Sequence, residues 1–162
     1  MLITTDPDEL APLLTDRSRL LGLDLGARTI GLATGTLDVG IATPLSTIQR
    51  TKFRQDAANL MALVARENIA ALVLGLPLNM DGSEGSRAQS TRAFVRNLAP
   101  FAPPPILLFD ERLTSAAAND GMKEAGLSRR NREAMIDAAA AAIILQDALT
   151  RLRSAATIKP VD

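Results

Sequence analysis

The sequence predicts an α/β fold in which helices flank a mixed five-stranded sheet whose first three strands are antiparallel. First, three apolar runs between residues 19 and 48 are separated only by short turns, and strands joined by short turns pair in antiparallel fashion. Second, from residue 53 onward, segments of helical periodicity alternate with short buried runs. Third, the 162 residues contain no internal repeat, low-complexity segment or linker, so we expect one domain with its own core.

The first third of the chain supplies an extension and the three antiparallel strands. Residues 1–18 are polar and show only a weak helical pattern, so we interpret them as an N-terminal extension. Residues 19–25 form the first strand. Residues 26–35 place three glycines around two apolar positions, which predicts a hairpin into the second strand. Residues 39–48 alternate enough to form the third strand, in which Pro44 is tolerated at a sheet edge or bulge.

Helices and buried strands alternate in the rest of the chain. The expected elements are, in order, a helix over about 53–67, a strand over 69–77, a helix over 88–98, a strand over 103–112, a short helix from 114 or 115 to about 124, and a long alanine-rich helix over 132–152. We expect the folded domain to span residues 19–153, with residues 154–162 as a frayed tail.

The absence of two residue types narrows the chemistry. With no histidine and no cysteine, the chain cannot form the usual zinc sites, a Ser-His-Asp triad or a cysteine nucleophile. Carboxylates remain as metal ligands, and such hard oxygen donors favour Mg²⁺ or Mn²⁺.

Composition also bears on location and partners. The acidic N-terminus is unlike a signal peptide, no disulfide framework exists, and no apolar run approaches the roughly 20 residues of a membrane span, so we expect a cytoplasmic protein with no membrane partner. The formal net charge is zero and only 2% of the residues are aromatic, which argues against an extended base-stacking platform. Basic residues nevertheless cluster at 50–54, 87–96 and 128–132, either as solvated surface or as phosphate contacts.

One charge interrupts the first predicted strand. Asp24 lies within a leucine-rich run that reads as buried on both faces. Transfer of an unpaired carboxylate into a core costs several kcal/mol or more, so such a group is paired, protonated or bound to a metal. Asp24 is therefore the first candidate ligand.

Two further acidic positions can join it. Asp110 and Glu111 follow a buried strand, and ligands in α/β sheets gather beyond the carboxyl ends of parallel strands. The alternative for Glu111 is a surface turn in which it pairs with Arg112. Asp137 lies on the last helix beside five consecutive alanines, which let that helix approach the sheet closely. The alternative for Asp137 is an exposed acid in the first helical turn, favoured by the helix dipole.

Three arginines favour the functional interpretation. Arg129, Arg130 and Arg132 lie at the start of the last helix, where positive charge opposes the helix dipole, and an anionic ligand would account for them. Convergent carboxylates can hold two divalent cations about 3.5–4 Å apart, which activate water and stabilise the leaving oxygen of a phosphodiester. Composition and spacing thus indicate a metal-dependent phosphoryl-transfer enzyme.

Four segments in order, "GLDLGARTIGLA", "LVLGLPLNMDGSEG", "FDERLTS" and "IDAAAAAIILQ", resemble the YqgF family of small RNase H-fold proteins related to RuvC-type Holliday-junction resolvases. The resemblance runs from about residue 19 to 152. It implies an RNase H-like fold with a mixed sheet, in which Asp24, Glu111 and Asp137 are the catalytic acids and ligands of Mg²⁺ or Mn²⁺. It also implies a nuclease that processes the 5′ end of the small-subunit ribosomal RNA precursor.

Other functions remain open at this point. By analogy the same acids would serve a Holliday-junction resolvase, which we would expect to be a homodimer because two symmetric cuts need two sites. RuvC-type resolvases carry an additional acid on the last helix, whereas Asp137 is followed by alanines. A non-catalytic nucleic-acid-binding protein of the same fold is a third reading, and an actin-like ATPase, suggested by "DLG", is a fourth that the short chain disfavours.

The candidate nucleic-acid contacts are mainly basic. Asn79 is added because its loop follows a buried strand and precedes a helix N-terminus, where backbone N–H groups can bind phosphate. A simple turn into the helix is the alternative reading of that loop. The residues that we expect to contact precursor rRNA or branched DNA are Arg28, Asn79, Arg112, Arg129, Arg130 and Arg132.

Overall fold

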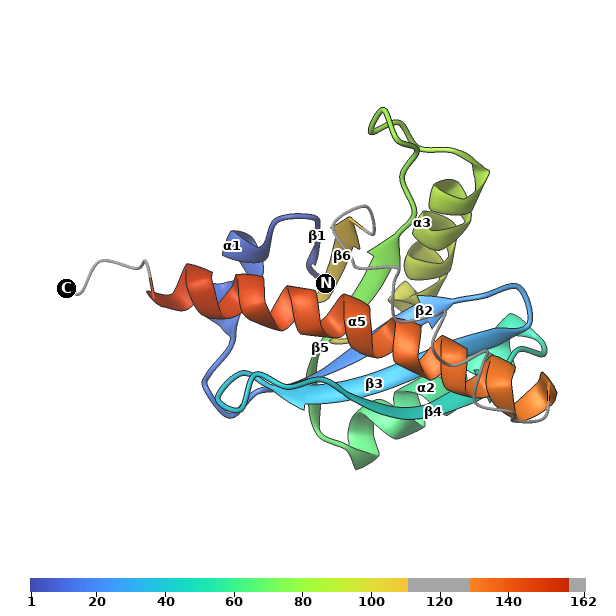
Figure 1. Cartoon of the computed structure of the whole chain (residues 1–162), viewed down its shortest axis with the longest axis horizontal. Coiled ribbons are helices and arrows are strands. Elements are labelled where there is room, and N and C mark those ends of the chain that lie inside the picture. Colours follow the sequence, from blue (N-terminus) through green and yellow to red (C-terminus); the bar gives the residue numbers. More distant parts are fainter. Residues whose placement is uncertain (111–128, 158–162) are drawn as a thin grey trace.

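A computed structural model describes residues 1–110 and 129–157, with side chains on the last helix from Met135 to Ala156. Its centre is a six-stranded mixed sheet with the order β1-β6-β5-β2-β3-β4 (Figure 1). The strands are β1 (Ile3–Thr4), β2 (Arg19–Leu25), β3 (Thr29–Thr36), β4 (Thr43–Gln49), β5 (Ile69–Leu76) and β6 (Ile106–Asp110). β2 pairs with β3 and β3 with β4 in antiparallel fashion, while β5 is parallel to both β2 and β6.

The mixed sheet with three leading antiparallel strands is confirmed, but it has six strands where the sequence predicts five. The additional strand, β1, lies in the segment interpreted as an extension and pairs in parallel with β6. The same segment forms α1 (Pro7–Leu10) and a short 3₁₀ helix, Ala11–Leu13, and the side chain of Leu10 is fully buried. A two-residue strand has no periodicity to detect. The domain limits at residues 19 and 153 stay a prediction.

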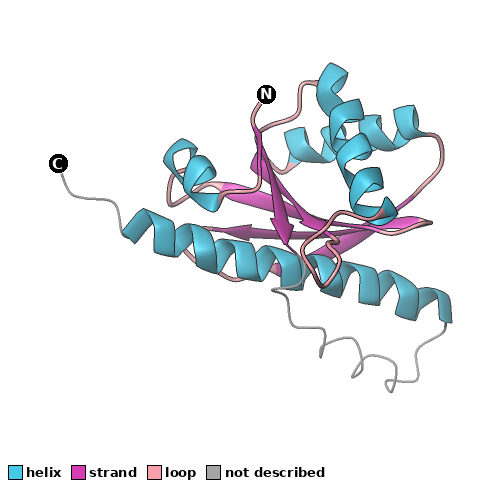
Figure 2. Ribbon diagram, turned by 90° about the horizontal axis from the view of Figure 1, so that it is seen from above, coloured by secondary structure: helices cyan, strands magenta, loops and turns pink. Residues whose placement is uncertain are grey.

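Helices cover both faces of the sheet (Figure 2). On one face α2 (Phe53–Arg66) and α3 (Ser86–Leu98) enclose a core with the odd-numbered leucines of β2, such as Leu21 and Leu23. On the other face α5 (Arg129–Thr157) packs with α1 against Leu20, Val73 and other residues. Successive side chains of a strand point to opposite faces, so the two cores divide each strand between them.

The last helix differs from its expected span. α5 begins at Arg129 and runs to Thr157, so it is longer at both ends than the expected span of 132–152, and part of the expected tail is helical. The short helix expected between residues 114 and 124 lies outside the described residues.

No helix in the described part of the chain is long and apolar enough to cross a membrane.

The path of α5 across the sheet is fixed by close backbone packing and by one amide. A Cβ atom on Gly22 of β2 would come within 2.8 Å of Leu145 Cβ and 2.9 Å of the Ala141 carbonyl oxygen. The backbones of α5 and β2 therefore pack directly against each other at this residue. Further along, the Gln146 side chain accepts a hydrogen bond from the Ala42 N–H at 2.9 Å and donates one to the Gly40 carbonyl at 2.7 Å. These contacts determine which residue of α5 lies above each strand.

Candidate active site

Asp24 lies on the face of β2 that α5 covers. Leu20 belongs to the core beneath α5 and Gly22 lies against that helix, so the alternation of the strand directs Asp24 to the same side. The carboxylate is half-buried near the carboxyl end of the strand. The Asp24 carboxylate therefore lies on the side of the sheet that α5 covers and is partly shielded from bulk water.

Asp137 comes to this place because β3 carries a glycine there. Asp24 pairs directly with Gly31 in the antiparallel register of β2 and β3. A Cβ atom on Gly31 would overlap the backbone carbonyl of Asp137. Asp24 and Asp137 thus belong to one crossing point, where α5 passes over neighbouring residues of two strands.

Thr29 orients the second carboxylate. It is the first residue of β3, on the same face as Gly31, and its hydroxyl donates a hydrogen bond to Oδ2 of Asp137. Both residues are half-buried. A hydrogen bond from a neutral hydroxyl fixes the position of a carboxylate while leaving its other lone pairs available for a cation.

The third predicted acid lies outside the described residues. β6 ends at Asp110, which is paired with Leu76 of β5 and half-buried, and Glu111 is the next residue of the chain. Arg112 also lies outside the described range. Among the residues that the structure describes, no group of three or more acidic side chains gathers in a manner suited to a metal ion.

The two described carboxylates nevertheless suit a hard divalent cation. Asp24 and Asp137 supply oxygen donors only, and the crossing point brings them from separate elements to one end of the sheet. Such a donor set is the one that Mg²⁺ and Mn²⁺ prefer in proteins.

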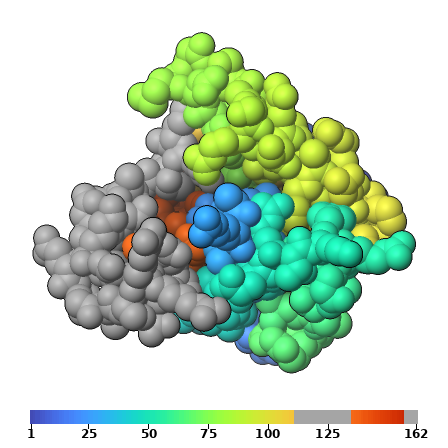
Figure 3. Space-filling view, turned by 90° about the vertical axis from the view of Figure 1, so that its right-hand side faces the viewer, coloured from blue at the N-terminus to red at the C-terminus, as the bar shows by residue number. Residues whose placement is uncertain are grey.

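The predicted arginine contacts lie in the β2–β3 turn and at the start of α5. Arg28 is exposed in the turn between β2 and β3. Arg129, Arg130 and Arg132 lie in the first turns of α5, and their side chains are outside the described set. Figure 3 shows the β2–β3 turn at the centre of one face, between α5 and the segment around residues 50–55.

Asn79 is exposed, and its amide takes part in closing its own loop. Its side-chain amide donates to Ser83 Oγ at 3.0 Å, and its N–H donates to the Ser83 carbonyl at 2.9 Å. Asp81 accepts from both the N–H and the hydroxyl of Ser83. The loop is therefore a hydrogen-bonded turn into α3, and a contact from Asn79 to substrate stays a prediction.

Sequence reasoning missed Thr29 and Gly31. The glycines of 26–35 predict a hairpin, which the antiparallel pairing of β2 and β3 confirms, but that pattern does not reveal that Gly31 also allows the close approach of α5. A usable signal exists: residues 31, 33 and 35 are Gly, Ala and Gly on one face of the strand, a pattern of small side chains that admits a tightly packed element.

Comparisons with known proteins show which proteins this chain is similar to. The family model described as "RuvX: Holliday junction resolvase" matches residues 18–151. A protein of Rhodobacter capsulatus named "Putative pre-16S rRNA nuclease" is 54% identical over 93% of this chain and 95% of its own length. A protein of Ruegeria pomeroyi with the same name is 51% identical over 94% of this chain and 99% of its own length.

A solved structure shares the fold. The RuvC of T. thermophilus, determined in complex with a Holliday junction substrate, superimposes with a TM-score of 0.51 and 16% sequence identity. The match covers 82% of this chain and 94% of that chain. At this identity the likeness establishes the RuvC-like, RNase H-like architecture.

Proposed function

Because the chain belongs to the RuvX family, we propose that it is a metal-dependent nuclease that hydrolyses a phosphodiester bond in the precursor of 16S ribosomal RNA. The observation that carries the proposal is the crossing of α5 over β2 and β3, which places Asp137 above Gly31, the register partner of Asp24. Relatives that share about half of the sequence over nearly its whole length bear the name of that activity. The proposal includes a cytoplasmic location and an RNA partner, since the precursor of the ribosomal RNA would be the substrate.

We assign the metal ligands to Asp24, Asp137 and Glu111. Bound Mg²⁺ or Mn²⁺ would activate a water molecule and stabilise the leaving oxygen. Gly31 sets the distance of Asp137 from the sheet, and Thr29 holds the orientation of its carboxylate. Glu111 follows the last residue of β6, two strands away from β2 in the sheet, and supplies the third carboxylate of the proposed site.

The proposed substrate contacts surround this site. Arg28 lies in the turn directly after the strand that carries Asp24, and the arginines of the first turns of α5 precede Asp137 on the same helix. Arg112 follows Glu111. Guanidinium groups bind phosphate oxygens with paired N–H donors, so these side chains would position the backbone of the RNA and neutralise its charge.

RNA is favoured over four-way DNA by the composition of α5. Asp137 is followed by five alanines. The turn of α5 after Asp137 therefore carries no second carboxylate for the site. RuvC-type resolvases carry a further acid on this helix, which a junction-resolving activity of this chain would lack.

A side-by-side cleavage assay tests the proposal. Purified protein with Mn²⁺ or Mg²⁺ is offered a 5′-extended 16S rRNA precursor and a four-way DNA junction, with Asp24→Asn and the exposed-site control Asp8→Asn in parallel. The proposal expects cleavage of the precursor by wild type and Asp8→Asn, and none by Asp24→Asn. Preferential cutting of the junction by a dimeric protein would replace it with the resolvase function. Equal precursor cleavage by wild type and Asp24→Asn would overturn it.

A further inference from the structure

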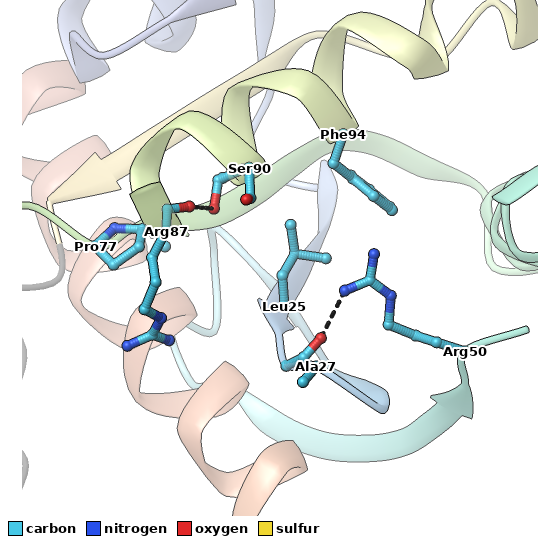
Figure 4. A pocket seen from close by; sticks show the side chains of 10 residues that line it. Leu25, Ala27, Arg50, Pro77, Arg87, Ser90 and Phe94 are labelled. Atoms are coloured by element: carbon cyan, nitrogen blue, oxygen red, sulfur yellow. Dashed lines mark hydrogen bonds between the residues drawn. The ribbon is translucent and has the colours of Figure 1, made fainter. Parts of the chain in front are cut away.

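A pocket lies on the opposite side of β2 from Asp24. It has a volume of about 260 Å³ and is bounded by the end of β2, the end of β5 and the first turns of α3 (Figure 4). Leu25 lines it, and Leu25 follows Asp24 directly in the strand, so the two side chains point to opposite faces. The turn that begins at Gly26 thus has the acidic crossing point on one side and this pocket on the other.

Arg50 is held in this pocket by three contacts. Its N–H donates to the Arg28 carbonyl at 2.8 Å, which continues the pairing of β4 with the β2–β3 hairpin. Its guanidinium donates to the Gly26 carbonyl at 2.6 Å and lies 5.8 Å from the centre of the Phe94 ring. A guanidinium carries five N–H donors, so this geometry fixes the group and leaves donors for a ligand.

Arg87 approaches the same pocket from the first turn of α3. Figure 4 shows Arg87 and Arg50 on opposite sides, with Leu25 and Ala27 between them. Among the described residues, no carboxylate pairs with either arginine, whereas Arg92 on the same helix pairs with Glu84 at 2.5 Å. Two like charges that line one small pocket repel each other, and an anion between them would remove that repulsion.

The pocket is suited to phosphate and not to a base. Its aromatic ring belongs to Phe94, which is 4% exposed and already faces the Arg50 guanidinium, so no free ring face is offered for stacking. Arginine forks match phosphate oxygens, and the nearby N-terminus of α3 adds partial positive charge.

We propose that Arg50 and Arg87 together bind one backbone phosphate of the nucleic-acid strand, next to the phosphate that is cut at the acidic site. The inference rests on the proposed function for its ligand class. The strand would cross the β2–β3 turn, which Figure 3 shows at the surface between α5 and the segment around residues 50–55. Because such a contact recognises only a backbone phosphate, it would position the nucleic-acid strand without selecting its base sequence.

Binding measured without divalent cations tests the pocket independently of cleavage. The probes are fluorescently labelled single-stranded RNA and DNA of one mixed sequence, titrated with protein in EDTA at several salt concentrations. The variants are Arg87→Gln, Arg50→Gln, the double variant and the control Arg96→Gln, an exposed arginine on α3 outside the pocket. Within the described part of the chain the Arg87 side chain is exposed and makes no ion pair, so its replacement should leave folding intact, which a thermal melt verifies.

Each pocket variant is expected to weaken binding of both probes about tenfold near 100 mM salt, as loss of a charge-assisted hydrogen bond does. Because both arginines hold one phosphate, the double variant should reduce the slope of log K against log salt by only about 0.7. Arg96→Gln should reduce binding less than threefold. If Arg87→Gln and Arg50→Gln match Arg96→Gln, or if wild type binds neither probe, the inference is overturned. A wild-type protein that binds through the pocket but cuts no precursor would refute the proposed function alone.

Discussion

Gly31 of β3 lies so close to the backbone carbonyl of Asp137 on α5 that no side chain fits between them. This contact connects the packing of the fold to the chemistry of the site, because Gly31 is also the direct partner of Asp24 across the β2–β3 ladder. The distance between the two acids therefore depends on the absence of a single methyl group.

Gly31→Ala should displace α5 and separate the two carboxylates. Inserting a methyl group into a packed interface costs about 1–3 kcal/mol, which corresponds to a melting temperature lower by roughly 2–10 °C for a chain of this size. Precursor cleavage should fall by more than the loss of folded protein explains, about 100-fold. Gly85→Ala, where a Cβ would meet only the Asn79 side chain at 3.3 Å, is the control for stability. A fully active and stable Gly31→Ala protein would contradict this account of the crossing.

Thr29→Val should weaken metal binding while preserving the fold. The substitution keeps the shape of the side chain and removes the hydroxyl that donates to Asp137. Partners of metal ligands affect metal affinity by about 10–100-fold, so the Mn²⁺ concentration for half-maximal cleavage should rise by that factor. Thr29→Ser keeps the hydroxyl and should remain close to wild type. Unchanged Mn²⁺ dependence in Thr29→Val would show that the hydroxyl has no role in the site.

We expect the stability of the folded protein to depend on pH because of the Asp147 carboxyl group. Burial raises the pKa of its carboxyl group, and its Oδ2 is buried without a hydrogen-bond partner in the described part of the chain. A raised pKa in the folded state means that stability is lost as the pH rises through that pKa. Asp147→Asn cannot ionise, so at pH 7 its melting temperature should exceed that of wild type by about 2 °C.

The difference should disappear near pH 3, where the carboxyl is protonated in both folded and unfolded chains. Thermal melts from pH 3 to 8 measure it, with the exposed-site variant Asp16→Asn as the control for loss of one charge. A variant less stable than wild type at pH 7 would mean that the Asp147 carboxylate is stabilised in the folded protein.

The strands and long helices could be predicted because each carries a periodic pattern of adequate length. The three antiparallel strands follow from apolar runs with short turns between them, and the helix Phe53–Arg66 follows from its apolar spacing. β1 could not be found in this way, since Ile3–Thr4 is too short for any period. Leu10, fully buried under α5, likewise gives no local sign of its burial.

Part of the candidate site could be predicted from the sequence. Asp24 stands out because a carboxylate in a leucine-rich strand is costly, a local argument that needs no tertiary structure. Thr29 and Gly31 act through their contacts with Asp137, which lies more than 100 residues away in the chain. No local sequence pattern could therefore predict their roles. The same holds for Arg50 and Arg87, which the sequence places in separate basic clusters and the fold places on one pocket.

A double-mutant cycle on cleavage of the 16S rRNA precursor tests the central claim most directly, namely that Asp24 and Asp137 act as one unit. Rates are measured for wild type, Asp24→Asn, Asp137→Asn and the double variant with saturating Mn²⁺. Groups that act together are strongly non-additive, so each single variant should lose about 10³-fold and the double variant no more than either. Wild-type rates in either single variant, or losses that multiply in the double variant, would contradict the claim.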